Sequence, residues 1–129
     1  MNIGGDPADL SYRYKRPKII AHFEHNETVI DNIAGLSRAL ETPPLYIIKF
    51  FGYELGTRSD RNRLRGRHNL DVLESLIEKY IKLFIICPKC LLPECDIVKH
   101  AVMLCRACGN SVVCRDHKIT TYMFAHPFY

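Results

Sequence analysis

The sequence predicts an α+β fold in which a small domain of mixed strands and three helices is followed by a C-terminal ribbon held by cysteines. Three observations support this prediction: short β-branched runs, three segments with apolar residues at helical spacing, and two CxxC pairs near the C-terminus. The predicted divisions are a mobile basic arm over residues 1–17, the α+β domain over 18–84, and the ribbon with a closing strand over 85–129.

The composition is typical of a soluble globular protein. The chain has 129 residues, of which 47% are hydrophobic and 25% are charged. It contains no long apolar run and no signal-peptide pattern, so we expect a cytoplasmic protein without a membrane partner. The net charge of +4 is concentrated in the arm and in residues 58–68, which favours a polyanionic partner such as RNA.

The N-terminal arm has few aliphatic residues and several glycines and prolines, so it cannot bury itself in a core. It contains the run Tyr12-Arg13-Tyr14-Lys15-Arg16. One interpretation is a solvated tail that contacts phosphates. The other is that the two tyrosines anchor Arg13 against a partner, because Tyr and Arg are favoured anchors in interfaces.

The domain begins with two short strands, predicted at residues 18–23 and 28–31 and joined by a turn over 24–27. Asp31 or Asn32 then caps a helix that ends at Leu40. A second helix is expected after Thr42 as its N-cap, with Pro43 at the first position and Gly56 as its end. The predicted core positions of these two helices are Ile33, Leu36, Leu40, Leu45, Ile48, Phe51 and Leu55.

Lys49 lies on a different face of the second helix, where it is available to a partner or simply solvated. Residues 57–68 then carry alternating arginines, which on one extended strand would all project from one face. Such a row could follow a nucleic-acid backbone, or it could be a solvated hairpin. The arginines of the row are Arg61, Arg63, Arg65 and Arg67.

The longest predicted helix covers residues 70–84, with Asn69 as its N-cap and an outer i,i+4 ion pair between Glu78 and Lys82. Because it runs directly into Cys87, we expect it to connect rigidly to the ribbon. Its predicted apolar face consists of Leu70, Leu73, Leu76, Ile77, Tyr80, Ile81 and Phe84.

Cys87, Cys90, Cys105 and Cys108 form the two CxxC pairs, separated by residues 91–104. Four thiolates from two turns make a closed tetrahedral site typical of one structural Zn²⁺, with no position left for a catalytic water. Unrelated cysteine pairs or a redox CxxC fit less well, because neither a secretory signal nor a βαβ pattern accompanies them.

Ribbon strands are predicted at residues 97–99, 102–104, 111–113 and 118–124. Cys95 and Cys114 are surplus thiols. Cys114 and His117 have CxxH spacing, but a second metal site would need two more ligands nearby. An ordinary buried cysteine and a surface histidine explain these residues better.

The sequence lacks the patterns of an active site. It has no GxxxxGK[ST] loop, no HExxH, no recognisable pair of carboxylates, and its six histidines are scattered. We therefore expect no enzyme with its own active site. Two classes remain: a zinc-ribbon module that binds nucleic acid, and a regulatory protein that lends a group to the active site of another protein.

Several motifs together resemble the family of eukaryotic translation initiation factor five. Residues 12–18 (YRYKRPK) resemble its YRYKMP arm, residues 49–56 (KFFGYELG) its KYFGxELG helix, and residues 117–122 (HKITTY) its closing strand. The resemblance covers about residues 6–127. The beta subunit of initiation factor two shares the core and the ribbon but lacks the Tyr-Arg-Tyr-Lys arm, so the arm favours factor five.

The resemblance implies a GTPase-activating protein for the gamma subunit of GTP-bound initiation factor two, acting on the small ribosomal subunit. Arg13 matches the family's arm arginine and would be an arginine finger in trans, and Lys49 matches a lysine linked to activity. Initiator tRNA, mRNA and ribosomal RNA would be contacted through Arg61, Arg63, Arg65 and Arg67. The alternative is a beta-subunit-like RNA-binding module without an activating role.

The sequence departs from the family pattern at several points. Arg16 replaces a methionine before Pro17, and Glu27 stands where a lysine is usual, in a shorter turn. Residues 57–68 are richer in arginine than their counterparts. The family's C-terminal helical-repeat domain is absent from this sequence, as in a fragment or a reduced version, so its bridging role is not assigned to these residues.

Overall fold

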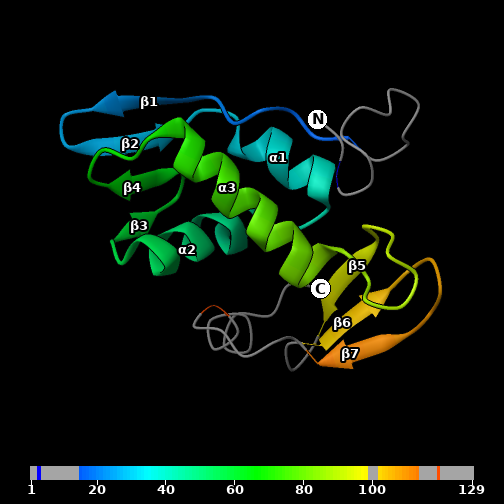
Figure 1. Ribbon diagram of the computed structural model, residues 1–129. Helices are drawn as coiled ribbons and strands as arrows, with labels where there is room; N and C mark the ends of the chain where they lie inside the picture. The colour runs from blue at the N-terminus through cyan, green and yellow to red at the C-terminus, as the bar shows by residue number, and fades with distance from the viewer. Residues whose placement is uncertain (1–2, 4–14, 99–101, 114–118, 120–129) are drawn as a thin grey trace.

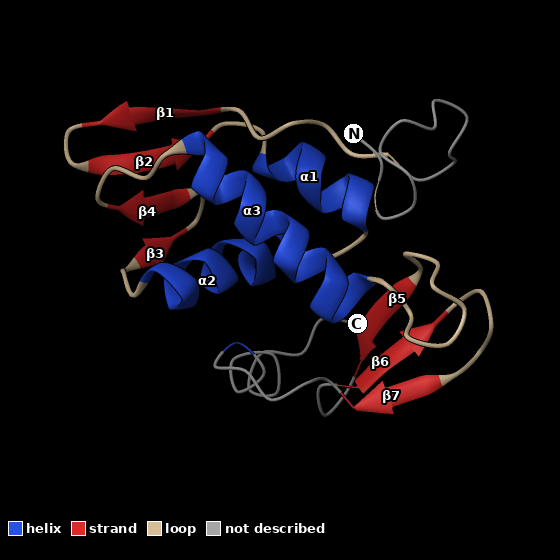
Figure 2. Ribbon diagram, in the orientation of Figure 1, coloured by secondary structure: helices blue, strands red, loops and turns tan. Residues whose placement is uncertain are grey.

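The computed structural model describes residues 3, 15–98, 102–113 and 119. Within these ranges the chain is α+β, as predicted, with three α-helices and two antiparallel sheets (Figures 1 and 2). The first sheet has the strand order β1-β2-β4-β3 and the second has the order β5-β6-β7. No helix in the described part of the chain is long and apolar enough to cross a membrane.

The elements of the first sheet are β1 (Ala21–Glu24), β2 (Glu27–Ile30), β3 (Ser59–Asp60) and β4 (Arg63–Arg65). Those of the second sheet are β5 (Cys95–Val98), β6 (Val102–Cys105) and β7 (Ser111–Val113). The helices are α1 (Ile33–Leu40), α2 (Pro44–Leu55) and α3 (Leu70–Tyr80), and a π-helical turn, η1 (Ile81–Ile85), follows α3.

One hydrophobic core joins the helices, the first sheet and the ribbon. The helix α2 contacts β3 and β4 and also α3, whose extension η1 contacts β5 (Figure 2). The rings of Phe50 and Tyr80 meet edge to face with centroids 5.3 Å apart, and Phe84 packs on Phe50 at 6.1 Å. Such aromatic pairs contribute about 0.5–1.5 kcal/mol each beyond their buried area.

The first hairpin is tighter than the sequence predicts. Strand β1 begins at Ala21 rather than at residue 18, and β2 already begins at Glu27. Only His25 and Asn26 form the turn, with His25 at a left-handed φ of 54°. Two-residue turns of this kind match the twist of the flanking strands, so Glu24 and Glu27 become a cross-strand pair.

An exposed ionic cluster connects β1 to the residue after β2. His22 Nδ1 lies 2.8 Å from Asp31 Oδ2, and His22 Nε2 lies 2.6 Å from Glu24 Oε2. These hydrogen bonds, the one to Asp31 first, raise the pKa of His22 above 6.5. The bond from His22 and the charge of Arg63 lower the pKa of Glu24 below 4.5. Both carboxylates therefore stabilise the protonated imidazolium of His22 relative to its neutral form.

We expect this cluster to make the free energy of unfolding depend on pH. Since the pKa of His22 is raised by folding, its contribution is fully present below pH 6.5 and is lost as the pH rises through the folded pKa. The contribution of Glu24 is fully present above pH 4.5 and is lost as the pH falls. The pair therefore stabilises the fold most between pH 4.5 and 6.5.

Chemical denaturation measured across this range and above it tests the prediction. His22→Gln should remove the decline in stability above pH 6.5, whereas His25→Asn, at the exposed turn beside it, should keep that decline. Identical pH profiles for the wild type and His22→Gln would contradict the assigned role.

The start of α2 differs from the prediction. Pro43 is the N-cap and Pro44 the first helical residue, whereas Gly56 ends the helix with a left-handed φ of 63°, as predicted. Thr42, the predicted cap, is buried instead, and its hydroxyl oxygen lies 2.7 Å from that of Tyr80. A threonine buried beside a tyrosine satisfies two polar groups that would otherwise be costly to bury.

The predicted core face of α2 is wrong at Leu45, which is 44% exposed. The helix packs against the first sheet on one side and against α3 on another, so it buries two faces. When a helix is apolar over most of its circumference, the spacing of its apolar residues does not show which of them are buried. The buried residues of α2 are Tyr46, Ile47, Ile48, Phe50, Phe51 and Gly52.

The cap of α3 is confirmed, because the Asp71 amide donates to Asn69 Oδ1 at 2.8 Å. Leu70 is 46% exposed, contrary to the prediction, because it lies in the first turn beyond the packed part of the helix. The helix leaves α geometry at Ile81, and the Ile86 amide donates to the Ile81 carbonyl at 2.9 Å. This π-helical turn brings both Phe84 and Ile85 into the core.

The second sheet agrees with the predicted ribbon strands near residues 102–104 and 111–113. Strand β5 begins earlier than predicted because Cys95 pairs with Cys105 on β6. The predicted closing strand at residues 118–124 lies outside the described residues, apart from the buried Ile119.

Candidate metal centre and basic pocket

The four predicted cysteines converge between α3 and the ribbon strands. The sulfur atoms of Cys87, Cys90, Cys105 and Cys108 all lie within 4.8 Å of one another. The Cys87–Cys108 and Cys90–Cys105 sulfur pairs are each 3.6 Å apart. A tetrahedral ion with four thiolates at about 2.3 Å requires sulfur–sulfur separations of about 3.8 Å. The four residues therefore have the spacing and the chemistry to hold a metal ion.

Two similar turns present these sulfurs. In the first, the Leu91 amide donates to the Cys87 carbonyl at 2.9 Å, and Leu91 adopts a left-handed φ of 63°. In the second, the Gly109 amide donates to the Cys105 carbonyl at 3.0 Å, and Gly109 has φ 75°. Glycine adopts this left-handed conformation without steric cost at position 109, whereas the matching position in the first turn is occupied by Leu91.

Polar hydrogens point at the sulfurs. The Lys89 amide donates to Cys87 Sγ at 3.4 Å, and Asn110 Nδ2 donates to Cys108 Sγ at 3.2 Å. The backbone and side-chain N–H groups of Asn110 lower the pKa of the Cys108 thiol to about 6. A thiol that ionises readily is a good metal ligand, because the thiolate is the form that binds.

The surplus thiol of Cys95 is buried on β5 opposite Cys105. Burial raises its pKa to about 12, so it stays a neutral thiol in the core, as an ordinary buried cysteine does. Cys114 and His117 lie outside the described residues.

The ribbon also contacts the helical part of the chain through an ion-paired arginine. Arg106 lies in the second cysteine turn and forms ion pairs with Asp96 on β5 and with Glu41 at the C-terminal end of α1. The second cysteine turn is therefore connected to the helices of the α+β body through Glu41.

The predicted row of arginines does not form one face. Arg61 lies in the β3–β4 turn with a left-handed φ of 52°, so only Arg63 and Arg65 share a strand and a face. Arg67 lies over the ring of Phe23, 5.2 Å from its centroid. The row is broken because the segment turns back on itself and Gly66, at φ 92°, bends it again.

The charge of Arg63 on β4 is neutralised. Arg63 lies 3.6 Å from carboxylate oxygens of both Glu24 and Glu27. Among the described residues, neither Arg58 nor Arg65 has an ion-pair partner. The Arg65 amide donates to the Arg58 carbonyl at 2.9 Å, which places these two arginines opposite each other across the β3–β4 hairpin.

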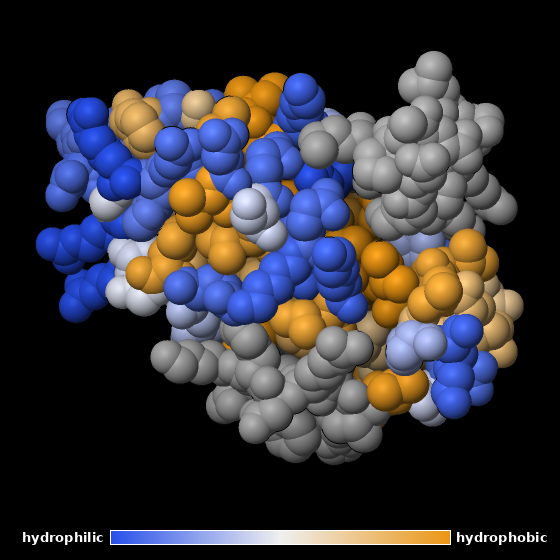
Figure 3. Space-filling model, in the orientation of Figure 1, coloured by the Kyte–Doolittle hydropathy of each residue, from blue (hydrophilic) through white to orange (hydrophobic). Residues whose placement is uncertain are grey.

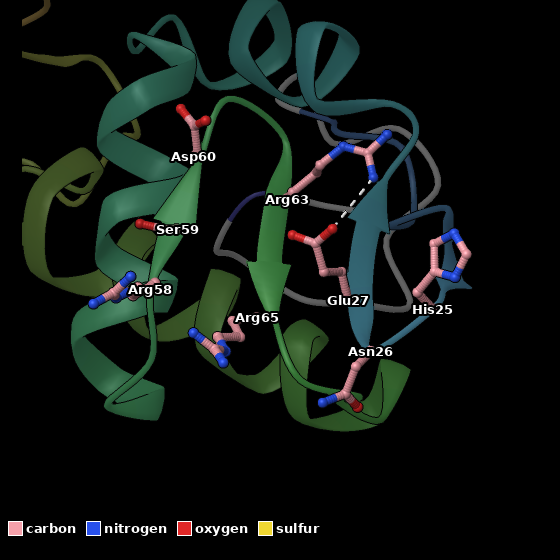
Figure 4. A pocket seen from close by; sticks show the side chains of 8 residues that line it. All are labelled: His25, Asn26, Glu27, Arg58, Ser59, Asp60, Arg63 and Arg65. Carbon is pink, nitrogen blue, oxygen red and sulfur yellow. Dashed lines mark ion pairs between the residues drawn. The ribbon is translucent and has the colours of Figure 1, made fainter.

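Arg58, Arg63 and Arg65 line an open pocket of about 500 Å³ (Figure 4). Figure 4 shows Arg58 and Arg65 extending side by side from the ends of adjacent strands, while Arg63 turns toward Glu27. Figure 3 shows strongly hydrophilic side chains projecting from the end of the molecule that carries β4. The remaining lining residues are His25, Asn26, Glu27, Ser59 and Asp60.

Sequence reasoning missed Arg58, because it lies outside the alternating pattern and joins the pocket only through strand pairing. Lys49 lies on α2 beside this pocket, half-buried, and its ammonium donates to the Ser59 carbonyl at 3.1 Å. Its proposed contribution to activity stays a prediction. Arg13 lies outside the described residues.

Comparison with known proteins identifies relatives over almost the whole chain. A family model described as a domain found in initiation factors 2B and 5 matches residues 6–111. Eukaryotic translation initiation factor 5 of Mus musculus is 34% identical over 143 residues, which cover 98% of this chain and 33% of the relative. The Saccharomyces cerevisiae protein of that name is 33% identical, with 98% and 35% covered.

A probable eukaryotic translation initiation factor 5-2 of Arabidopsis thaliana is 35% identical, with 98% of this chain and 32% of the relative covered. The chain thus spans about a third of the length of these relatives. The four-cysteine centre, the α+β body and the extended sequence similarity agree: this chain belongs to the domain family found in initiation factors 2B and 5.

Proposed function

We propose that this chain acts in translation initiation as a GTPase-activating protein. It promotes hydrolysis of the GTP bound to the gamma subunit of initiation factor two and has no active site of its own. The observation that carries this proposal is the similarity over 98% of the chain to relatives named eukaryotic translation initiation factor 5. The arm sequence of residues 12–18 supports it further.

The chemistry assigned to Arg13 is that of an arginine finger. Transfer of the γ-phosphoryl group to water spreads negative charge over the phosphoryl oxygens in the transition state. A guanidinium is planar and permanently charged, and it can donate two parallel hydrogen bonds to those oxygens. Lys49 is a second proposed contact with the partner, from the α2 side of the body.

The body to which the arm is attached is proposed to be held by one structural Zn²⁺ on the four cysteines. Zn²⁺ suits this site because four thiolates form a closed tetrahedral set, which fits a structural ion. With all four ligand positions occupied by sulfur, the ion would stabilise the fold without taking part in hydrolysis.

The basic pocket is proposed to bind RNA phosphates. Arg58 and Arg65 carry charges that no described carboxylate neutralises, and they lie side by side on an exposed edge. Guanidinium groups bind phosphate oxygens with paired, charge-assisted hydrogen bonds. Initiator tRNA, mRNA and small-subunit ribosomal RNA are the proposed polyanions. Arg61 and Arg67 flank the pocket, and Arg63 is the weakest contributor because Glu24 and Glu27 already pair with it.

The proposal is tested by single-turnover GTP hydrolysis in a reconstituted initiation complex, with and without this protein. A rate that rises with the protein supports GTPase activation. A rate that is the same with and without it, while the protein still binds the complex, supports the second candidate, a beta-subunit-like RNA-binding module. A basic pocket that binds RNA is consistent with both candidate functions. Only the measurement of GTP hydrolysis therefore separates them.

Replacing Arg58 and Arg65 with glutamine should weaken RNA binding and make it less dependent on salt. Loss of two phosphate contacts should reduce the slope of log K against log salt by about 1.4 on single-stranded RNA. Filter binding of a short single-stranded RNA over a range of salt concentrations measures the slope. The control is Arg38→Gln with Lys82→Gln, which removes two exposed charges away from the pocket. An equal change in both double variants would indicate a non-specific charge effect.

A further inference from the structure

Arg16, which the sequence places at the end of the arm, is one of the most buried charged side chains described. The whole residue is 2% exposed and its side chain is 0% exposed. Arg16 Nη2 lies 2.8 Å from Glu74 Oε2 and 2.8 Å from Glu78 Oε1, and Nη1 donates to the Pro17 carbonyl at 3.0 Å. The predicted Glu78–Lys82 pair is therefore wrong, because Glu78 turns to Arg16 instead.

Residues 18–20, which follow Arg16, are held by α3, the helix that carries Glu74 and Glu78, and by the start of α1. The Ile19 amide donates to Glu74 Oε1 at 2.7 Å, so one carboxylate holds both the guanidinium and the backbone. Asn32 accepts from the Ile20 amide at 2.9 Å and donates to the Lys18 carbonyl at 2.7 Å. These contacts keep residues 16–20 extended beside α1 on the way to β1 (Figure 1).

A buried ion pair of this kind adds little net stability, because removing the charges from water offsets most of their attraction. It does restrict geometry, since a guanidinium between two carboxylates has few alternative positions. The contacts of Arg16 thus form a clamp, defined here as Arg16 with Glu74 and Glu78. The two carboxylates come from successive turns of α3 and lie 58 and 62 residues away in sequence.

We propose that this clamp is a positioning device for the arginine finger, and that Arg16 is a positioning residue for GTPase activation. The inference rests on the proposed function of Arg13. With the clamp closed, three residues connect Arg13 to a fixed point on the body, a reach of about 10 Å. Without it, the first fixed residue is Lys18, whose carbonyl accepts from Asn32, and the tether has five residues.

The length of the tether sets the expected effect. The effective concentration of a tethered group falls with about the −3/2 power of tether length, so going from three to five residues lowers it roughly 2-fold. Loss of the fixed starting direction adds to this, since small misplacements of a catalytic group are costly. Opening the clamp should therefore lower the maximal stimulated rate by about 2-fold or more, while the concentration for half-maximal stimulation stays unchanged.

The test compares Arg16→Met with Lys18→Met, which removes the same charge from an exposed position in the same segment. Both are assayed by single-turnover GTP hydrolysis in the reconstituted complex, and the exchange rate of the Ile19 amide is measured by NMR. In Arg16→Met we expect the lower maximal rate together with faster Ile19 exchange. In Lys18→Met both quantities should match the wild type. Arg16→Lys, which can contact one carboxylate at a time, should lie between the two.

An insertion variant separates positioning from a merely structural role of Arg16. Two Gly/Ser residues placed between Lys15 and Arg16 recreate the five-residue tether while leaving the clamp residues unchanged. The maximal rate should again fall about 2-fold, with wild-type thermal unfolding and wild-type Ile19 exchange. If Arg16→Met fails to fold, this variant alone decides, and a full rate with the insertion would overturn the inference.

The outcomes also distinguish this inference from the function on which it rests. If Arg13→Lys stimulates GTP hydrolysis to the wild-type rate, the finger is wrong and the positioning role is excluded as well. If Arg13→Lys is impaired but Arg16→Met keeps the full rate despite faster Ile19 exchange, the proposed function stands and the positioning role is overturned.

Discussion

Removal of the proposed Zn²⁺ should unfold the ribbon. The second sheet consists of three strands of three or four residues, and two of its four described core residues, Cys95 and Cys105, are cysteines. Small modules of this kind depend on their ion, and the binding free energy of structural Zn²⁺ in them is about 10–16 kcal/mol. We expect chelation to abolish the NMR signals of β5 to β7 and to release about one Zn²⁺ per chain.

The effect should reach beyond the ribbon, because Phe84 and Ile85 belong to the same core as Cys87 and Cys105. The matched test is Cys105→Ser against Cys95→Ser, since these two residues face each other across β5 and β6 and are both buried. Only Cys105→Ser should lose the metal. A chelated protein that kept a dispersed ribbon spectrum would contradict a structural role for the ion.

Replacing Arg13 with lysine should have the largest effect on activity. Lysine keeps the positive charge but loses the planar pair of donors that fits the transferring phosphoryl group. Arginine fingers supplied by a partner raise the rate about 10³–10⁵-fold, equivalent to about 4–7 kcal/mol. We therefore expect Arg13→Lys to lose most of the stimulated GTP hydrolysis, measured at saturating protein, without any change in thermal unfolding.

The control for this variant is Arg38→Lys, the same chemical change at an exposed arginine of α1 away from the basic pocket. This variant should keep the stimulated rate. Equal stimulation of GTP hydrolysis by Arg13→Lys and by the wild type would exclude the finger and leave the RNA-binding module as the function of this chain.

The parts of the structure that depend on short-range chemistry could be predicted from the sequence. Asn69 caps α3 through its own side chain, and Gly56 ends α2 because a left-handed residue is needed there. The CxxC spacing brings Cys87 near Cys90 and Cys105 near Cys108 by local turns alone. In each case the cause lies within a few residues of the effect, where a linear pattern records it.

What only the tertiary structure decided is which groups meet across the chain. The sheet and α3 cover two faces of α2, and Leu45 lies on neither of them, so it is exposed. The predicted row of arginines does not form because β3 and β4 pair as a hairpin. In the sequence, Arg16 is one of several basic residues of the arm. In the structure, it is paired with Glu74 and Glu78 of α3. Such contacts depend on packing between segments far apart in sequence, and no local periodicity or spacing encodes them.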